Sequence, residues 1–249
     1  MKTKTVFRRL LTVCAALLCL FTMSSTNANA SFFAAICDDL ACSGGNDFIV
    51  QDNVAPDTLP QLGAINFSVV AFGFNLVVNT SQSKPVIGSA VNPQLDLTFS
   101  ATTADAVSHT VFLFASDTDF TRVGAFPDNF IMTLAATNSG GSGTETARAW
   151  GGTNNLNFPN NFSGANLLST IGPLSGGAIS GSSAGSFLAA VSPFALTIGV
   201  QINRTTAGTT TGDQNFTATP VPEPASVALL GGIMLFSVGV IRRRKVRQG

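Results

Sequence analysis

Residues 194–202 read Phe-Ala-Leu-Thr-Ile-Gly-Val-Gln-Ile, and this stretch decides the fold class. Every second residue from Phe194 to Ile202 is large and apolar, while the residues between them are small or polar. Successive side chains of a β-strand point to opposite faces, so this alternation predicts a strand with one face in a core. Sustained helical periodicity is missing from residues 31–220, which favours an all-β chain.

The same alternation recurs along the chain in shorter runs. Candidate strands lie around residues 48–50, 65–69, 74–78, 95–99, 111–115, 130–134, 187–191 and 216–218. Turn-forming residues separate them, namely Gly73, Lys84-Pro85, Asn92-Pro93, Ser116–Asp119, 126–128 and Ser192-Pro193. Many short strands with turns between them predict a single β-sandwich or jelly-roll-like domain over residues 31–203.

Two segments depart from this pattern. Residues 138–186 contain 11 glycines and little alternation, which predicts long loops on one face of the domain. Residues 204–220 are rich in threonine, and we expect them to form a stem, with a last strand at 215–219 as an alternative for part of it.

The charge balance limits the functions open to this chain. The 249 residues are formally neutral, but residues 31–220 carry 4 basic against 12 acidic residues, a formal charge of −8. Nucleic-acid binding needs a basic surface, so we exclude it. The chain has one histidine and two glutamates, which leaves little material for acid–base catalysis, and we expect a protein that is not an enzyme and has no catalytic residues.

The N-terminus has the three parts of a secretory signal peptide. Basic residues at positions 2–9 precede an uncharged apolar run over 10–23, and Ala28-Asn29-Ala30 forms a cleavage site that leaves Ser31 as the new N-terminus. The alternative is an N-terminal membrane anchor, for which the run is short. The sequence therefore predicts export across the inner membrane, with signal peptidase as a transient partner and residues 1–30 removed.

Export leaves two cysteines, Cys37 and Cys42. A close pair in an oxidising compartment is typical of a structural disulfide. Two free thiols and a metal or redox site are the alternatives, and a metal would need more ligands than two thiolates.

The C-terminus carries the most specific signal. Val221-Pro222-Glu223-Pro224 precedes 17 uncharged residues, 225–241, which are long enough for a transmembrane helix across a thin bilayer. A basic cluster follows at once and marks the cytoplasmic side; it consists of Arg242, Arg243, Arg244, Lys245 and Arg247. The simpler interpretation is a permanent single-pass membrane protein.

Taken together, these three parts resemble the PEP-CTERM sorting signal, which exosortase recognises in Gram-negative bacteria that make exopolysaccharide. The resemblance covers residues 221–249 and the accompanying signal peptide. It implies that the chain is held in the inner membrane transiently through 225–241 and is cut near the Val221–Pro224 motif. The product then reaches the cell surface, the outer membrane or the extracellular matrix.

Two candidate ligand sites arise from the residues themselves. Asp117-Thr118-Asp119 would place two carboxylates on one side of a tight turn, and a calcium ion takes several oxygen ligands of this kind. Turn-forming and solubilising aspartates are the alternative. Trp150, followed by two glycines in the expected long loop, could stack on a sugar ring; the alternative is a tryptophan packed in the core.

These observations predict an exported structural or adhesive protein in an exopolysaccharide or biofilm context, with exopolysaccharide as a partner and no required cofactor. The alternative is a specific carbohydrate-binding module, calcium-dependent in one form, that uses Asp117, Asp119 and Trp150.

Overall fold

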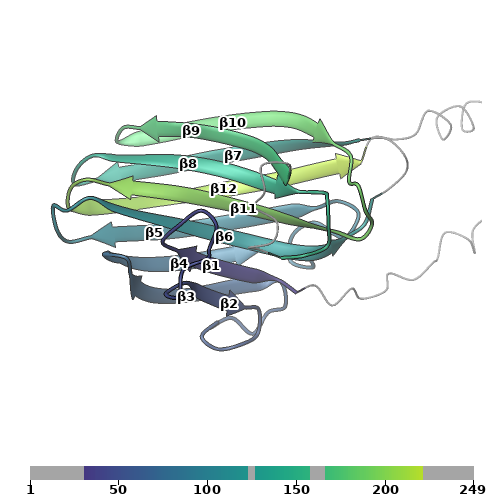
Figure 1. The fold of residues 1–249 in the computed structure, drawn as a ribbon, viewed down its shortest axis with the longest axis horizontal. Coiled ribbons are helices and arrows are strands. Elements are labelled where there is room, and N and C mark those ends of the chain that lie inside the picture. The colour runs from purple at the N-terminus through teal and green to yellow at the C-terminus, as the bar shows by residue number, and fades with distance from the viewer. Residues whose placement is uncertain (1–30, 123–126, 158–165, 221–249) are drawn as a thin grey trace, which may run out of the picture.

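The computed structural model describes residues 31–122, 127–157 and 166–220, which form two stacked, six-stranded antiparallel sheets (Figure 1). The described residues contain no α-helix, so the predicted all-β sandwich is confirmed. Sheet A has the order β2 (Phe48–Gln51), β1 (Phe33–Cys37), β6 (His109–Phe120), β11 (Phe194–Arg204), β8 (Gly143–Gly151) and β9 (Leu167–Ser175). Sheet B has the order β10 (Ala178–Phe187), β7 (Asp128–Ser139), β12 (Gly208–Pro220), β5 (Gln94–Thr103), β4 (Phe74–Gln82) and β3 (Ala64–Ala71).

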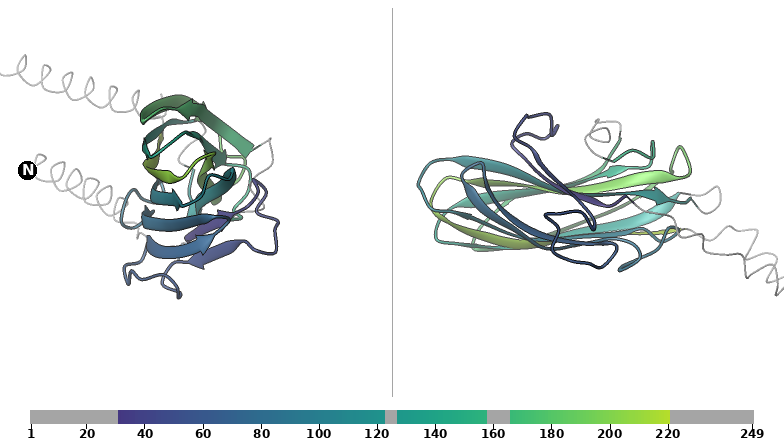
Figure 2. Two further views of the ribbon diagram at one scale, coloured as in Figure 1. Left: turned by 90° about the vertical axis from the view of Figure 1, so that its left-hand side faces the viewer. Right: turned by 90° about the horizontal axis from the view of Figure 1, so that it is seen from below.

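The core lies between the two sheets, which the end-on view in Figure 2 separates into two layers. Phe194, Leu196, Ile198, Val200 and Ile202 of β11 are all buried there, as their alternation predicts. Sheet B contributes the opposing layer from the inward side chains of its strands, many of them phenylalanine. Burial of these side chains is the main term that stabilises the sandwich.

The threonine-rich segment is a correction to the predicted domain boundary. Residues 208–220 form β12, a 13-residue strand in the middle of sheet B, paired with β5 on one side and β7 on the other. The stem expected at 204–220 is therefore part of the sandwich. The sequence did not predict this strand because its inward residues are not regularly apolar. They include Thr210, Gly212 and Gln214 as well as Phe216 and Ala218.

The glycine-rich segment 138–186 is a second correction. It contains β8, β9, β10 and the end of β7, so the expected long loops are strands over most of their length. Small residues are needed there: a Cβ at Gly181 would lie 2.4 Å from Cγ2 of Ile171 on β9. The expected strand at 187–191 is also displaced, because β10 ends at Phe187.

A buried polar network joins the two sheets at one end of the sandwich. The Arg204 guanidinium of sheet A donates to the Asn138 side-chain carbonyl and to the Thr210 hydroxyl of sheet B, each at 3.1 Å. Asn138 in turn donates to Glu145 Oε2 at 3.1 Å. Burial raises the pKa of Glu145. Glu145 is therefore a structural residue of this buried network.

The predicted signal peptide and sorting signal lie outside the described residues, including the transmembrane helix over 225–241. Within the described ranges, no helix has the length and apolar character needed to cross a membrane.

Candidate functional site

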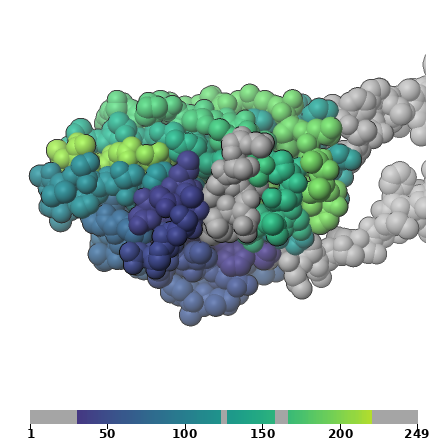
Figure 3. Space-filling model, in the orientation of Figure 1, coloured from purple at the N-terminus to yellow at the C-terminus, as the bar shows by residue number. Residues whose placement is uncertain are grey.

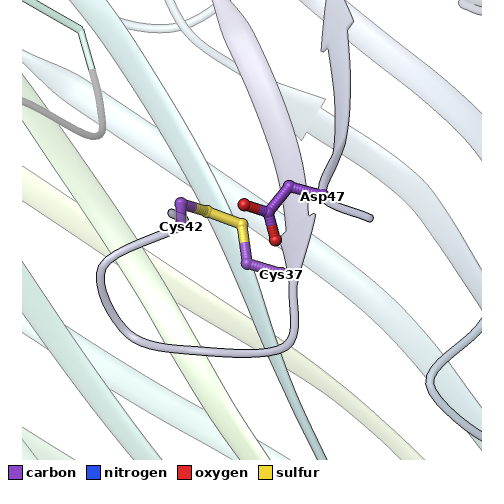
Figure 4. A group of neighbouring side chains, drawn as sticks. All are labelled: Cys37, Cys42 and Asp47. Carbon is purple, nitrogen blue, oxygen red and sulfur yellow. A yellow bond between two sulfur atoms is a disulfide. The ribbon is translucent and has the colours of Figure 1, made fainter. Parts of the chain in front are cut away.

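Cys37 and Cys42 form the predicted disulfide (Figure 4). The bond closes a short loop after β1 that packs on the outer face of sheet A against Phe112, Phe114 and Trp150. The space-filling view in Figure 3 shows this N-terminal segment, in purple, raised on that face. The disulfide therefore holds a small second core outside the sandwich.

Asp47 lies beside the disulfide, and Cys37, Cys42 and Asp47 are the one group of potential metal ligands within 4.8 Å of one another in the described part of the chain. The two sulfurs are bonded to each other, so they are not thiolate ligands in this state. Burial raises the pKa of the Asp47 carboxyl, and the charges of Asp38 and Asp39 add to the effect. This cluster is a structural one.

The tight turn expected at Asp117-Thr118-Asp119 is wrong, because these residues belong to β6. Asp117 points between the sheets, is fully buried, and accepts hydrogen bonds from Lys84 Nζ at 2.9 Å and from the Ser83 hydroxyl at 2.5 Å. The Lys84 ammonium also lies 3.9 Å from the centre of the Phe120 ring. Burial raises the pKa of Asp117, and the Lys84 charge opposes that rise.

Asp119 has different surroundings. It adopts a positive φ of 63° in a bulge of β6, and it exchanges two hydrogen bonds with the Asn155 amide, each at 2.8 Å. Thr118 donates to both carboxylates, from its backbone N–H to Asp117 and from its hydroxyl to Asp119, but the other partners of the two groups differ. Among the described residues, Asp117 and Asp119 are not part of a group of potential metal ligands, so the structure does not bring them together as a calcium site.

Trp150 is also placed differently from the sugar-stacking expectation. It lies on β8, is only 2% exposed, and packs with its ring centre 6.0 Å from that of Phe114. An indole that is this buried does not offer a face to a ligand, so the alternative of a packed tryptophan is the correct one.

The outer face of sheet B carries a candidate site that the sequence analysis did not predict. A shallow, open groove crosses β10, β7, β12, β5 and β4. The polar side chains in its lining are hydroxyls and amides apart from one carboxylate, and they belong to Asn79, Thr98, Thr137, Ser180, Thr211 and Asp213. Alternation places these side chains outward because their neighbours in sequence fill the core. The threonines of 204–220 could have indicated this face, if they had been interpreted as the outward side chains of a strand.

Two carboxyl groups meet at this groove. The Thr98 hydroxyl donates to Asp213 Oδ1 at 2.9 Å and lies 3.4 Å from Asp96 Oδ2, and the Asn215 amide donates to Asp213. Burial, followed by the hydrogen bond and the charge of Asp213, raises the pKa of Asp96 from 3.8 to about 7. The six strands of sheet B contain no lysine, arginine or histidine, so no basic side chain on these strands neutralises the pair.

The comparisons with known proteins give distant likenesses of fold. No family model and no curated protein matches the chain. Among solved structures, the enzymatically active domain of bacteriophage CBA120 tailspike protein 4 has a TM-score of 0.33 at 7% identity; the match covers 60% of this chain and 18% of that one.

Two carbohydrate-binding modules are also similar. TmCBM61, solved with β-1,4-galactotriose, has a TM-score of 0.29 at 8% identity over 66% of this chain and 98% of that one. The family 11 module from Clostridium thermocellum, solved with a mixed-linked tetrasaccharide, has a TM-score of 0.26 at 8% identity over 67% and 95%.

Proposed function

We propose that this chain is an exported, non-catalytic protein that binds uncharged polysaccharide weakly through the outer face of sheet B. The observation that carries the proposal is the groove on that face, where each of five adjacent strands contributes one outward hydroxyl or amide group between small and apolar residues. Sugar hydroxyls both donate and accept hydrogen bonds, as do these side chains, so the two surfaces are chemically matched.

The groove favours weak binding repeated over a long polymer. Phe99 is the single aromatic residue in its lining and is fully buried, so ring stacking contributes nothing. Hydrogen bonds exchanged with water add only about 0.5–1.5 kcal/mol each. Retention on a polymer then depends on many copies acting together, which suits a structural or adhesive protein of an extracellular matrix.

The carboxyl pair supports binding over hydrolysis. Retaining glycosidases hold their two carboxyl groups about 5–5.5 Å apart, and inverting enzymes hold them farther apart. Asp96 and Asp213 are instead hydrogen-bonded to each other on an open sheet face, which leaves no room for a reacting bond between them. In the proposal Asp213, the one carboxylate of the groove lining, accepts hydrogen bonds from sugar hydroxyls.

A substitution in the groove tests the binding proposal. Thr211→Arg should abolish retention on insoluble neutral glucans, mannans and galactans, because the larger side chain fills the middle of the groove. Thr217→Arg is the matched control, since Thr217 lies on the same strand and face but outside the lining. Equal retention of the two variants and the unaltered protein would remove the groove from the proposal.

The route to the matrix is the second part of the proposal. A chain with the predicted signal peptide and the PEP-CTERM-like tail is expected to be a substrate of exosortase. Deleting residues 221–249 should remove the protein from the surface and matrix fractions while residues 31–220 are still exported. Mass spectrometry of the mature protein provides the check: peptides from 233–249 in protein from its final location would indicate a permanent membrane anchor instead.

A further inference from the structure

The two sheets end in four edge strands, and three of these are protected against pairing with another chain. β2 has only four residues. β9 contains Pro173, which lacks an N–H, at a point where its pairing with β8 shifts register. β3 has a bulge near Asn66, and the backbone N–H of Thr58 donates to the Asn66 carbonyl at 2.9 Å. Such features are the usual means of blocking edge-to-edge association.

β10 is the unprotected edge. It pairs with β7 over ten consecutive residues without a register shift, and in the described residues β7 is the one strand paired with it in sheet B. Strand β9 of sheet A lies beside it, where the Ser169 hydroxyl donates to the Ser183 hydroxyl at 2.7 Å, but β9 forms no backbone ladder with β10 (Figure 1). Its sequence is Ala-Ile-Ser-Gly-Ser-Ser-Ala-Gly-Ser-Phe, with no proline and no charge, and most of it is exposed. A strand without a bulge, built mostly of small residues, leaves its outer N–H and C=O groups open to another backbone.

We infer that β10 pairs with β10 of a second copy of this chain, in antiparallel register, so that the two sheets B join into one twelve-stranded sheet. The charge distribution selects this occupant. Two copies of a domain with a formal charge of −8 repel each other, but β10 and its neighbour β9 contain no charged residue. The nearest outward carboxylates, those of Asp213 on β12, would lie five strand spacings apart.

Five spacings of about 4.8 Å give a separation of about 24 Å. The screening length at physiological salt is about 8 Å, so the repulsion between the two Asp213 carboxylates is largely removed. If a two-fold axis perpendicular to the joined sheet relates the two copies, the outer faces of both sheets B lie on the same side of that sheet. At the position where the axis passes, a residue of β10 lies directly opposite the same residue of the second copy.

Cysteine cross-linking of the full chain tests the inference. In a background of Cys14→Ala and Cys19→Ala, single cysteines are introduced on β10 and the cells are treated with a mild oxidant. Side chains on the axis would have Cβ atoms about 4.5–5.5 Å apart, close enough for a disulfide after a small adjustment. The positions, chosen to avoid the glycines that pack against Ile171 and Phe130, are Ser180, Ser182, Ser183, Ala184 and Ser186.

The expected result is a covalent dimer on a non-reducing gel, strongest at one position of β10 and weaker on either side. Ser68→Cys is the matched control, because Ser68 is equally exposed on the outer face of the opposite edge strand β3 and should give no dimer. A β10 scan with no dimer at any position overturns the inference. So does a Ser68→Cys dimer of equal yield, which would indicate random collision. Neither result depends on whether the groove binds polysaccharide.

Discussion

At the scale of single residues, the carboxylates show how environment separates chemically identical groups. Asp117 forms a buried ion pair with Lys84, and Asp119 lies in a bulge of β6. Asp96 shares a hydrogen bond with Asp213 beside the groove. Their spacing along the chain suggested a calcium site at Asp117 and Asp119. It could not reveal the pair that does form, since Thr98 and Asp213 at the same place are 115 residues apart in sequence. Strand pairing, which local spacing does not encode, brings them together.

The buried ion pair makes a first prediction. Lys84→Met leaves the Asp117 carboxyl buried without its cation, so the free energy of unfolding at neutral pH should fall by about 3–5 kcal/mol. The double variant Lys84→Met/Asp117→Leu should recover most of this loss, because no charge is then left in the interior. Urea denaturation of the three proteins measures both effects. A double variant as unstable as the single one would contradict this explanation.

The Asp96 carboxyl makes a second prediction. Its pKa is 3.8 before burial and about 7 in the fold, so between these values the folded chain holds a proton that the unfolded chain has released. The stabilisation from this group is complete at low pH and is lost as the pH rises toward about 7. Asp96→Asn keeps a donor to Asp213 but cannot ionise. Its stability should therefore fall less steeply than that of the unaltered protein between about pH 5 and about pH 7.5.

Thermal unfolding at several pH values measures this difference. The comparison between the two proteins isolates Asp96, because burial also raises the pKa values of Asp117, Asp128 and Glu145, and those groups contribute equally to both. Parallel stability curves would show that Asp96 is an ordinary surface carboxylate.

At the scale of elements, strands with large inward side chains could be predicted and strands with small ones could not. β11, β5 and β7 alternate between large apolar and polar residues, and their positions followed directly. β10 is built from glycine, serine and alanine because Ile171 and Phe130 occupy the space where its side chains would project. Because side chains of neighbouring strands fill the space on its inner face, β10 has no alternation of large apolar residues. Its sequence therefore predicted a loop.

The role of β12 makes a third prediction. A chain ended after Ala207 lacks the strand that pairs with both β5 and β7, so sheet B is divided and the inward Phe216 is lost from the core. We expect this chain to be insoluble or protease-sensitive, whereas one ended after Pro220 should resist proteolysis. Limited proteolysis of the two chains makes the comparison. Equal resistance would restore the interpretation of 204–220 as a stem.

At the scale of the whole molecule, the groove and the edge lie on the same side of the structure. Ala178, Ile179 and Ser180 of β10 line one end of the groove, so a second copy paired at β10 would bring its own groove alongside. Two weak sites on one rigid sheet engage the same polymer with an avidity that exceeds either affinity. Association and polysaccharide binding would then reinforce each other.

This arrangement makes a fourth prediction. Ser182→Lys/Ser186→Lys places like charges across the proposed seam while leaving the groove lining unchanged. Retention on an insoluble neutral polysaccharide should fall about tenfold or more, as expected when bivalent binding becomes monovalent. Ser68→Lys on β3 is the control and should have no effect. If the β10 variant has lost the dimer but its retention is unchanged, polysaccharide binding does not depend on dimer formation.

The central position of β12 also bears on when the protein matures. β12, the last strand of the described residues, is needed in the middle of a sheet whose first member, β3, begins 144 residues earlier (208 − 64), so β5 and β7 each lack one partner until Pro220 is available. Closure of such non-local pairings is slow and comes late. A nascent chain that completes its sheets late stays unfolded for longer, which is the state that the proposed export through a secretion channel would require.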